Sequence, residues 1–96
     1  MKVSFLEPAR DEFLGAADFY EDQAAGLGAD FAAEVEHANA TIAQTPHLGT
    51  PYIDTTRRLL LDRFPYNIVY SIEPDTVVII AVAHQRRKPG YWKDRA

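Results

Sequence analysis

The spacing of apolar residues changes abruptly along this chain, from a helical period in its first half to a strand period in its second. From Phe13 to Ala24, apolar side chains recur three and four residues apart, which places them on one side of an α-helix. From Tyr66 to Glu73, apolar side chains alternate with mostly polar ones, as in a strand with one covered face. Helices followed by strands indicate an α+β fold, in which the helices pack on one face of a sheet.

The predicted elements follow one another in the order β-α-α-β-β-β. A short strand over residues 2–6 precedes a helix that begins near Ala9 and breaks at the glycines of residues 26–28. A second helix begins near Ala29 and ends before Pro46, which makes a helical hairpin. After a loop over residues 45–56, strands are expected at residues 58–61, 66–73 and 77–83. The last strand is an unbroken apolar run, typical of a central strand covered on both faces of a mostly antiparallel sheet.

The size and composition of the chain limit its class. Ninety-six residues suit one domain, which we expect to span residues 1–96. The lack of cysteine excludes disulfides, thiolate zinc sites and cysteine nucleophiles, and it fits a reducing cytoplasm. No stretch approaches the roughly 18 apolar residues that cross a bilayer, and the N-terminus is too polar for a secretory signal. We therefore expect a soluble, cytoplasmic protein with no membrane partner.

Charge is divided unevenly between the two halves of the chain. Residues 1–56 contain ten acidic and two basic residues, whereas residues 57–96 contain eight basic and four acidic ones, for a net charge of -4. Such a split is found where one surface binds an anion, and also where the two halves neutralise each other across the fold. Because most of the acidic residues fall on the predicted helices, we expect the helices to face away from a polyanionic target.

Residues that could bind and cleave a phosphodiester gather after the last predicted strand. His84 directly follows the apolar run, and Arg87 and Tyr91 lie close enough to fold back towards it through a turn at Pro89 and Gly90. A guanidinium stabilises charge on a phosphate, while an imidazole or a phenol can transfer protons. The alternative for His84 is a rim histidine hydrogen-bonded to the backbone.

The orientation of these side chains follows from strand parity. Val78, Ile80 and Val82 share the parity of His84, so we expect the imidazole to continue their face. In the preceding strand, Arg58 has the opposite parity to Arg57 and Arg63, so only one of these two sets can join His84. The alternative for all three arginines is the protection of an edge strand.

Other residues of the chain favour structural interpretations. A tryptophan beside a short sheet more often covers a core than binds a base, so we expect Trp92 to cover core. Glu34 and Glu36 are expected to lie on the solvated surface of a helix. His37 and His47 lack the spacing of metal ligands, and the glycines of residues 26–28 follow a helix rather than a strand. We therefore expect no metal, no cofactor and no phosphate-binding loop.

Two stretches carry a family resemblance: GLGADFAAEVEHA in the helical hairpin, and RRLLLDRFPYNIVYSIEPDTVVIIAVAHQRRKPGYWKDR in the second half. With them the chain resembles the RelE/ParE superfamily of bacterial toxin–antitoxin toxins, over nearly its whole length. The resemblance implies two antiparallel helices on a curved sheet. It also implies growth inhibition and an antitoxin partner, usually encoded next door, whose C-terminal segment folds on binding.

The superfamily has two branches with different functions. RelE-like members resemble metal-independent ribonucleases that cut messenger RNA on the ribosome, whereas ParE-like members poison DNA gyrase without that catalytic set. The resemblance gives Arg58 and Arg87 the role of stabilising charge, and His84 or Tyr91 that of transferring protons. The sequence slightly favours the ribosome-dependent endoribonuclease; a gyrase inhibitor and a non-toxic antitoxin-binding relative are the alternatives.

An antitoxin would need an apolar surface on which to fold. We expect a groove between the helix pair and the sheet, because Phe13, Tyr20 and Phe31 give the helices more apolar side chain than a hairpin readily hides. Phe31 is the one of the three for which a core position is favoured.

Overall fold

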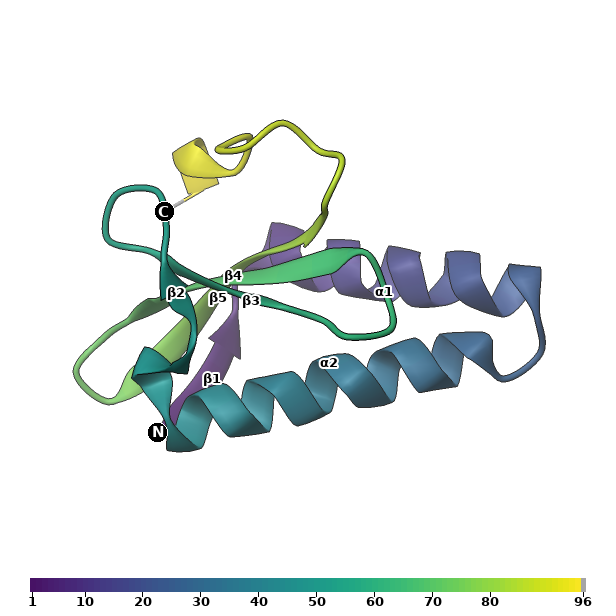
Figure 1. The fold of residues 1–96 in the computed structure, drawn as a ribbon, viewed down its shortest axis with the longest axis horizontal. Helices are drawn as coiled ribbons and strands as arrows, with labels where there is room; N and C mark the ends of the chain where they lie inside the picture. Colours follow the sequence, from purple (N-terminus) through teal and green to yellow (C-terminus); the bar gives the residue numbers. More distant parts are fainter. Residues whose placement is uncertain (96) are drawn as a thin grey trace.

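Two long antiparallel helices lie side by side against one face of a five-stranded sheet (Figure 1). The computed structural model describes residues 1–95. The helices and strands are β1 (Lys2–Phe5), α1 (Glu7–Gln23), α2 (Leu27–Gln44), β2 (Thr50–Pro51), β3 (Arg57–Leu60), β4 (Tyr66–Ile72) and β5 (Thr76–His84). This arrangement confirms the predicted α+β class and helical hairpin. In the described part of the chain, neither helix is long and apolar enough to cross a membrane.

The strands lie in the order β1-β5-β4-β3-β2, and β1 pairs with β5 in parallel while the other pairs are antiparallel. The two-residue strand β2 was not predicted, because Thr50 and Pro51 carry no periodic pattern of their own. It pairs with β3, with Thr50 opposite Arg58 and Pro51 opposite Arg57. The interpretation of these two arginines as protection of an edge strand is therefore wrong, since β2 occupies that edge.

A bulge in β5 overturns the parity expected for His84. Val69 of β4 pairs with Ala81, but the next residue, Tyr70, pairs with Ile79, so Ile80 is an extra residue. Beyond the bulge the two faces of β5 exchange. Val82 therefore shares the helix-covered face with Ile79 and not with Ile80, which packs on the opposite face.

The main core lies between the helices and the sheet. The predicted stripe of α2 is confirmed: Phe31, Val35 and Ile42 are completely buried. Phe13 and Tyr20 of α1 pack against Phe31, with ring centroids 6.2 Å and 5.3 Å from it. Phe31 is thus part of the core, and Phe13 and Tyr20 are half-buried against it, while the groove expected to accept an antitoxin stays a prediction.

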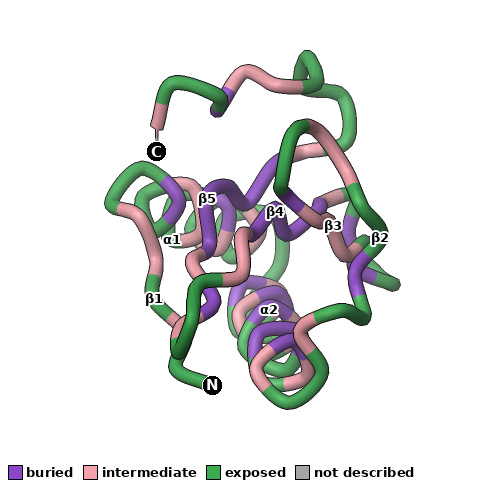
Figure 2. Tube along the Cα trace, turned by 90° about the vertical axis from the view of Figure 1, so that its left-hand side faces the viewer, coloured by how far each residue is buried: buried purple, intermediate pink, exposed green. Residues whose placement is uncertain are grey.

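The face of the sheet opposite to the helices carries a second, smaller core, closed by the segment after β5. Trp92 is only 4% exposed and packs with Val69, Ile80, Ala81 and Ala83. The residues around it in the C-terminal segment are exposed or half-buried (Figure 2). The expectation that Trp92 covers core is confirmed, and both faces of β5 are covered as predicted.

Two acidic residues of the helices have structural roles. Glu21 accepts hydrogen bonds from the backbone N–H groups of Gly26 (2.9 Å) and Gly28 (3.0 Å), which satisfies donors at the start of α2. Glu34 accepts from the backbone N–H groups of Asp62 (2.6 Å) and Arg63 (3.2 Å) and so holds the loop between β3 and β4. Glu34 is therefore not merely solvated surface, as its sequence context suggested.

Candidate functional site

The site begins where β5 ends and the backbone leaves the sheet. His84 pairs with Tyr66 at the last position of the β4–β5 ladder, and the ring centroids of the two side chains are 5.1 Å apart at an interplanar angle of 78°. The imidazole Nδ1 accepts a hydrogen bond of 3.0 Å from the backbone N–H of Arg86. Because Nδ1 is an acceptor, the neutral ring carries its proton on Nε2 and presents a donor there.

Arg87 and Tyr91 are brought together by the turns that follow β5. The guanidinium carbon of Arg87 lies 3.8 Å from the centroid of the Tyr91 ring, within range of a cation–π interaction. The Tyr91 hydroxyl donates a hydrogen bond of 2.7 Å to a carboxylate oxygen of Glu12. Burial, followed by this hydrogen bond to Glu12, raises the pKa of Tyr91 far above its ordinary value. The phenol is therefore held protonated and directed towards α1.

Glu12 is a central residue that the sequence did not reveal. Its two carboxylate oxygens each accept a hydrogen bond of 2.8 Å from a terminal nitrogen of Arg95. One of them also accepts a hydrogen bond of 3.0 Å from the backbone N–H of Val82. Burial alone would raise the pKa of Glu12, but the hydrogen bonds from Arg95, Tyr91 and Val82 outweigh it and lower the pKa. An acidic residue early in a helix normally indicates only a favourable dipole interaction, so no local pattern identified this role.

Arg95 completes the link between the C-terminal segment and the sheet. Besides Glu12, it donates a hydrogen bond of 3.1 Å to the carbonyl oxygen of Ile80, the bulged residue. The side chains of Glu12 and Arg95 are only 17% and 18% exposed, so the pair is shielded from screening by solvent. Glu12 and Arg95 thus satisfy backbone groups of β5 beyond the end of β1.

Arg58 lies on the face of the sheet that is not covered by the helices. It pairs with Val69 in the sheet, and its guanidinium lies 4.4 Å from the centroid of the Tyr52 ring. All four residues predicted from the sequence, Arg58, His84, Arg87 and Tyr91, line one small cavity of about 60 Å³ between the sheet and the C-terminal segment. We call it the tail cavity. Its remaining walls include Tyr52, Asn67, Val69, Ala83, Lys88 and Trp92.

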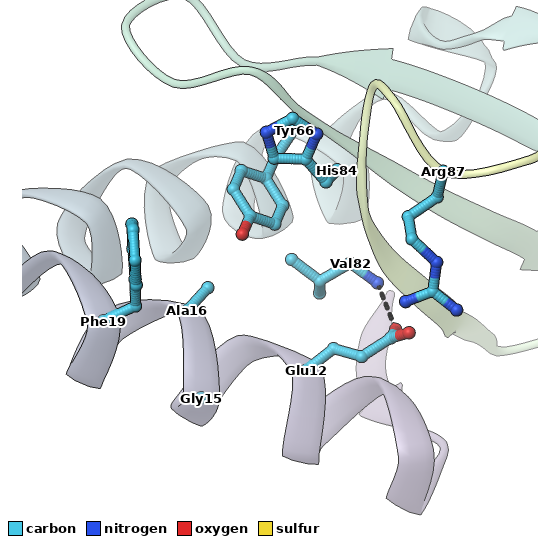
Figure 3. Close-up of a pocket in the computed structure, with 8 residues that line it drawn as sticks. All are labelled: Glu12, Gly15, Ala16, Phe19, Tyr66, Val82, His84 and Arg87. Atoms are coloured by element: carbon cyan, nitrogen blue, oxygen red, sulfur yellow. Dashed lines mark hydrogen bonds between the residues drawn. The ribbon is translucent and has the colours of Figure 1, made fainter.

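A larger and more open pocket of about 260 Å³ lies on the helix side of the same strand end (Figure 3). Glu12, Ala16 and Phe19 of α1 line one side of it, and His84 and Arg87 line the other. We call it the helix pocket. Phe19 is 56% exposed at its rim, so this pocket combines an apolar patch with one acidic and two basic side chains.

The chemistry offered by the two hollows differs. The tail cavity has Arg58, Arg87 and Lys88 and no carboxylate among its lining residues, so it suits an anion. The helix pocket includes Glu12, whose charge is already matched by Arg95. Within residues 1–95, no three His, Asp or Glu side chains gather in a way that could hold a metal ion.

Comparisons with known proteins agree with the fold. The model of the family described as the ParE toxin of the type II toxin–antitoxin system parDE matches residues 3–89. Among solved structures, the chain is similar to one described as the chromosomal ParDE toxin–antitoxin system from P. aeruginosa, with a TM-score of 0.74 and 15% sequence identity. That match covers 88% of this chain and 95% of the other. No curated protein sequence matches the chain. Since the family model spans most of its length, the chain belongs to the ParE toxin family of type II toxin–antitoxin systems.

Proposed function

We propose that this toxin inhibits DNA gyrase by binding it, without catalysing a reaction. Membership of the ParE family makes the chain the toxin of a type II pair, with an antitoxin as its partner. The gyrase target is the one that the resemblance to ParE-like members implies. The arrangement of side chains at the end of β5 supports binding over catalysis.

The observation that carries this proposal is the lack of a free proton acceptor among the four residues predicted for catalysis. Cleavage of RNA by its own 2′-hydroxyl needs a group that accepts the hydroxyl proton. Tyr91 donates a hydrogen bond to Glu12 and has a raised pKa, so the phenol stays protonated and cannot accept the hydroxyl proton. Nδ1 of His84 is occupied by the N–H of Arg86, which leaves a donor at Nε2. Hydrogen-bond donors and cations of this kind can bind an anion, but they cannot remove the proton from the 2′-hydroxyl.

A ribosome-dependent endoribonuclease is the second candidate. One observation favours it: Arg58, His84, Arg87 and Tyr91, chosen from the sequence alone, line the same cavity. In that mechanism Arg58 and Arg87 would stabilise charge on the phosphate, and His84 would protonate the leaving oxygen through Nε2. The 2′-hydroxyl would then need a base from the ribosome or from water.

The two functions are separated by measuring them on the same preparation. Purified toxin is added to gyrase with relaxed plasmid, and in parallel to translating ribosomes with a defined messenger RNA. We expect loss of supercoiling activity and intact messenger RNA. Cleavage of the messenger RNA with normal supercoiling would replace this proposal by the ribonuclease.

Variants of two neighbouring arginines test whether gyrase inhibition depends on the residues at the end of β5. Arg87→Ala removes a cation that lines both the tail cavity and the helix pocket. Arg86→Ala removes a neighbouring cation that is also exposed but lines neither. We expect Arg87→Ala to lose gyrase inhibition while retaining antitoxin binding, and Arg86→Ala to retain both. Equal inhibition by the two variants would remove Arg87 from the binding surface.

A further inference from the structure

We propose that the tail cavity binds the carboxylate of a single acidic side chain of a protein partner. The inference rests on the proposed function in one respect, namely that this site binds a protein instead of cleaving RNA. It assigns to the cavity a ligand chemistry that follows from its unpaired polar groups, its charge and its shape.

Two buried polar atoms at the tail cavity have no hydrogen-bond partner among residues 1–95. They are Nε of Arg58 and Oδ1 of Asn67. Asn67 is only 7% exposed, so its amide is almost completely removed from solvent. Leaving such groups unpaired costs about 1–3 kcal/mol each, so in a native structure they point to a missing partner. Since the orientation of an asparagine amide can reverse, Arg58 and Asn67 can both offer an N–H to one acceptor.

The charge around the tail cavity favours an anion as that acceptor. Arg58, Arg87 and Lys88 line it, and none of them forms a salt bridge with a carboxylate within residues 1–95. The chain as a whole has a net charge of -4, but these three residues belong to its basic second half, and the fold brings them to one cavity. A bound carboxylate would neutralise it by charge-assisted hydrogen bonds.

Two of these cations are already held in place by aromatic rings. The guanidinium of Arg58 lies 4.4 Å from the centroid of the Tyr52 ring, and that of Arg87 lies 3.8 Å from the centroid of the Tyr91 ring. The Tyr91 ring is fixed in turn by its hydroxyl bond to Glu12. Little side-chain entropy remains to be lost on binding, because the donors are positioned before the ligand arrives.

The size and walls of the tail cavity favour a carboxylate over a phosphodiester. A volume of about 60 Å³ admits only a small group, and Val69, Ala83 and Trp92 give it apolar walls. A carboxylate stands at the end of an aliphatic stem and can enter such a space end-on. A phosphodiester lies within a chain, with a sugar on each side, and cannot.

Acetate is the probe for a carboxylate, and inorganic phosphate at the same ionic strength is the probe for a phosphate. Each is titrated into the toxin, and the NMR signals of the Arg58 Nε–H and the Asn67 side-chain amide are followed. We expect acetate to shift both signals saturably. In Arg58→Gln its affinity should fall about tenfold, the equivalent of one charge-assisted hydrogen bond.

Arg86→Gln is the matched control, because it removes the same charge from an exposed residue that does not line the cavity. It should bind acetate as the wild type does. If Arg58→Gln fails to fold, Arg87→Gln replaces it, since Arg87 is exposed and also lines the cavity. Absence of a saturable acetate shift, equal loss in the control, or tighter binding of phosphate than of acetate would each overturn the proposal.

Gyrase inhibition measured on the same samples keeps the two proposals apart. Acetate binding without inhibition of supercoiling would refute the gyrase function and leave the carboxylate site standing. Inhibition of supercoiling without acetate binding would refute the carboxylate site and leave the gyrase function standing.

Discussion

At the scale of single residues, Glu12 joins three separate parts of the chain. Its carboxylate lies on α1, accepts from the backbone of β5 and binds both Tyr91 and Arg95 of the C-terminal segment. Removing the charge leaves Arg95 without its partner in a shielded position, and a half-satisfied buried pair is strongly unfavourable.

We expect Glu12→Gln to lower the free energy of unfolding at pH 7 by about 1–3 kcal/mol, the cost of an unpaired buried polar group. Urea unfolding followed by circular dichroism measures it. Asp11→Asn is the control, because Asp11 is an exposed neighbour on the same helix and should change stability little. Equal effects of the two variants would mean that the hydrogen bonds of Glu12 do not stabilise the fold.

The same carboxylate predicts a dependence of stability on pH. Because the pKa of Glu12 is lowered below its ordinary value of 4.5 in the folded protein, its stabilising contribution is present above pH 4.5. It is lost as the pH falls through the lowered value, where the folded state must also take up the proton. The difference in unfolding free energy between wild type and Glu12→Gln should therefore shrink below pH 4.5. A constant difference down to pH 3 would contradict this assignment.

The sequence predicted which polar residues lie close together, but not the contacts that they make. Arg58, His84, Arg87 and Tyr91 do gather at one cavity, since the end of a buried strand followed by a turn limits where polar residues can lie. Their partners could not be predicted, because Glu12 lies far away along the chain and contacts Tyr91 only through the tertiary fold. The same applies to Glu34, whose carboxylate binds a loop distant in sequence.

At the scale of elements, the two helices depend on close contact at Gly28. A methyl group there would collide with the backbone carbonyl of Ala17, which cannot move aside without shifting α1. Gly15 lies in the interior of α1, where the same methyl group would meet no atom within 4 Å.

We expect opposite effects from alanine at these two glycines. Gly28→Ala should destabilise the protein by about 1–3 kcal/mol through overpacking of the helix pair. Gly15→Ala should stabilise it by about 0.5–1 kcal/mol, because alanine loses less conformational entropy in a helix. Thermal unfolding of both variants measures the two signs; a stabilised Gly28→Ala would refute the packing of α2 on α1.

The segment after β5 is stabilised chiefly by its single tryptophan. Trp92→Ala should lower the free energy of unfolding by about 3–5 kcal/mol, since it empties most of the second core. Phe19→Ala is the control, because Phe19 is 56% exposed and its loss should cost little. Circular dichroism is the suitable measurement, since Trp92 is the only tryptophan and its fluorescence disappears with it. Similar losses in both variants would mean that the segment does not cover a core.

Elements were predictable where periodicity was unbroken. Phe31, Val35 and Ile42 lie on the predicted face of α2 and are buried. The parity of β5 was not predictable, because its run of apolar residues looks the same with or without an extra residue. Ile80 is distinguished only by its pairing with β4, which a single strand does not encode.

At the scale of the whole molecule, acidic and basic residues occupy different parts of the fold. Nine of the ten acidic residues of the first half lie on α1 and α2, while Arg58, Arg87 and Lys88 surround the tail cavity. The acidic helix surface would repel DNA bound to gyrase. The face with the tail cavity is the one suited to an acidic target.

We therefore expect the double variant Asp18→Lys, Asp22→Lys to inhibit gyrase as well as the wild type. Both aspartates are exposed on α1. Glu21 lies between them but is left unchanged, because its carboxylate holds the start of α2. Supercoiling assays measure the inhibition, and circular dichroism verifies the fold. A folded double variant without inhibition would place the target on the helices.

The parallel pairing of β1 with β5 has a consequence for how the toxin is made. Residues 2–5 pair with residues 76–79, so β1 has no partner in the sheet until these later residues have also been synthesised. Until then the apolar residues of β4 and the helices have no complete sheet to pack against, and pairings this distant in sequence form slowly. The five-stranded sheet therefore cannot be complete until residues 76–79 have been synthesised. An antitoxin that recognises the finished fold would thus meet its toxin only after most of the chain has been made.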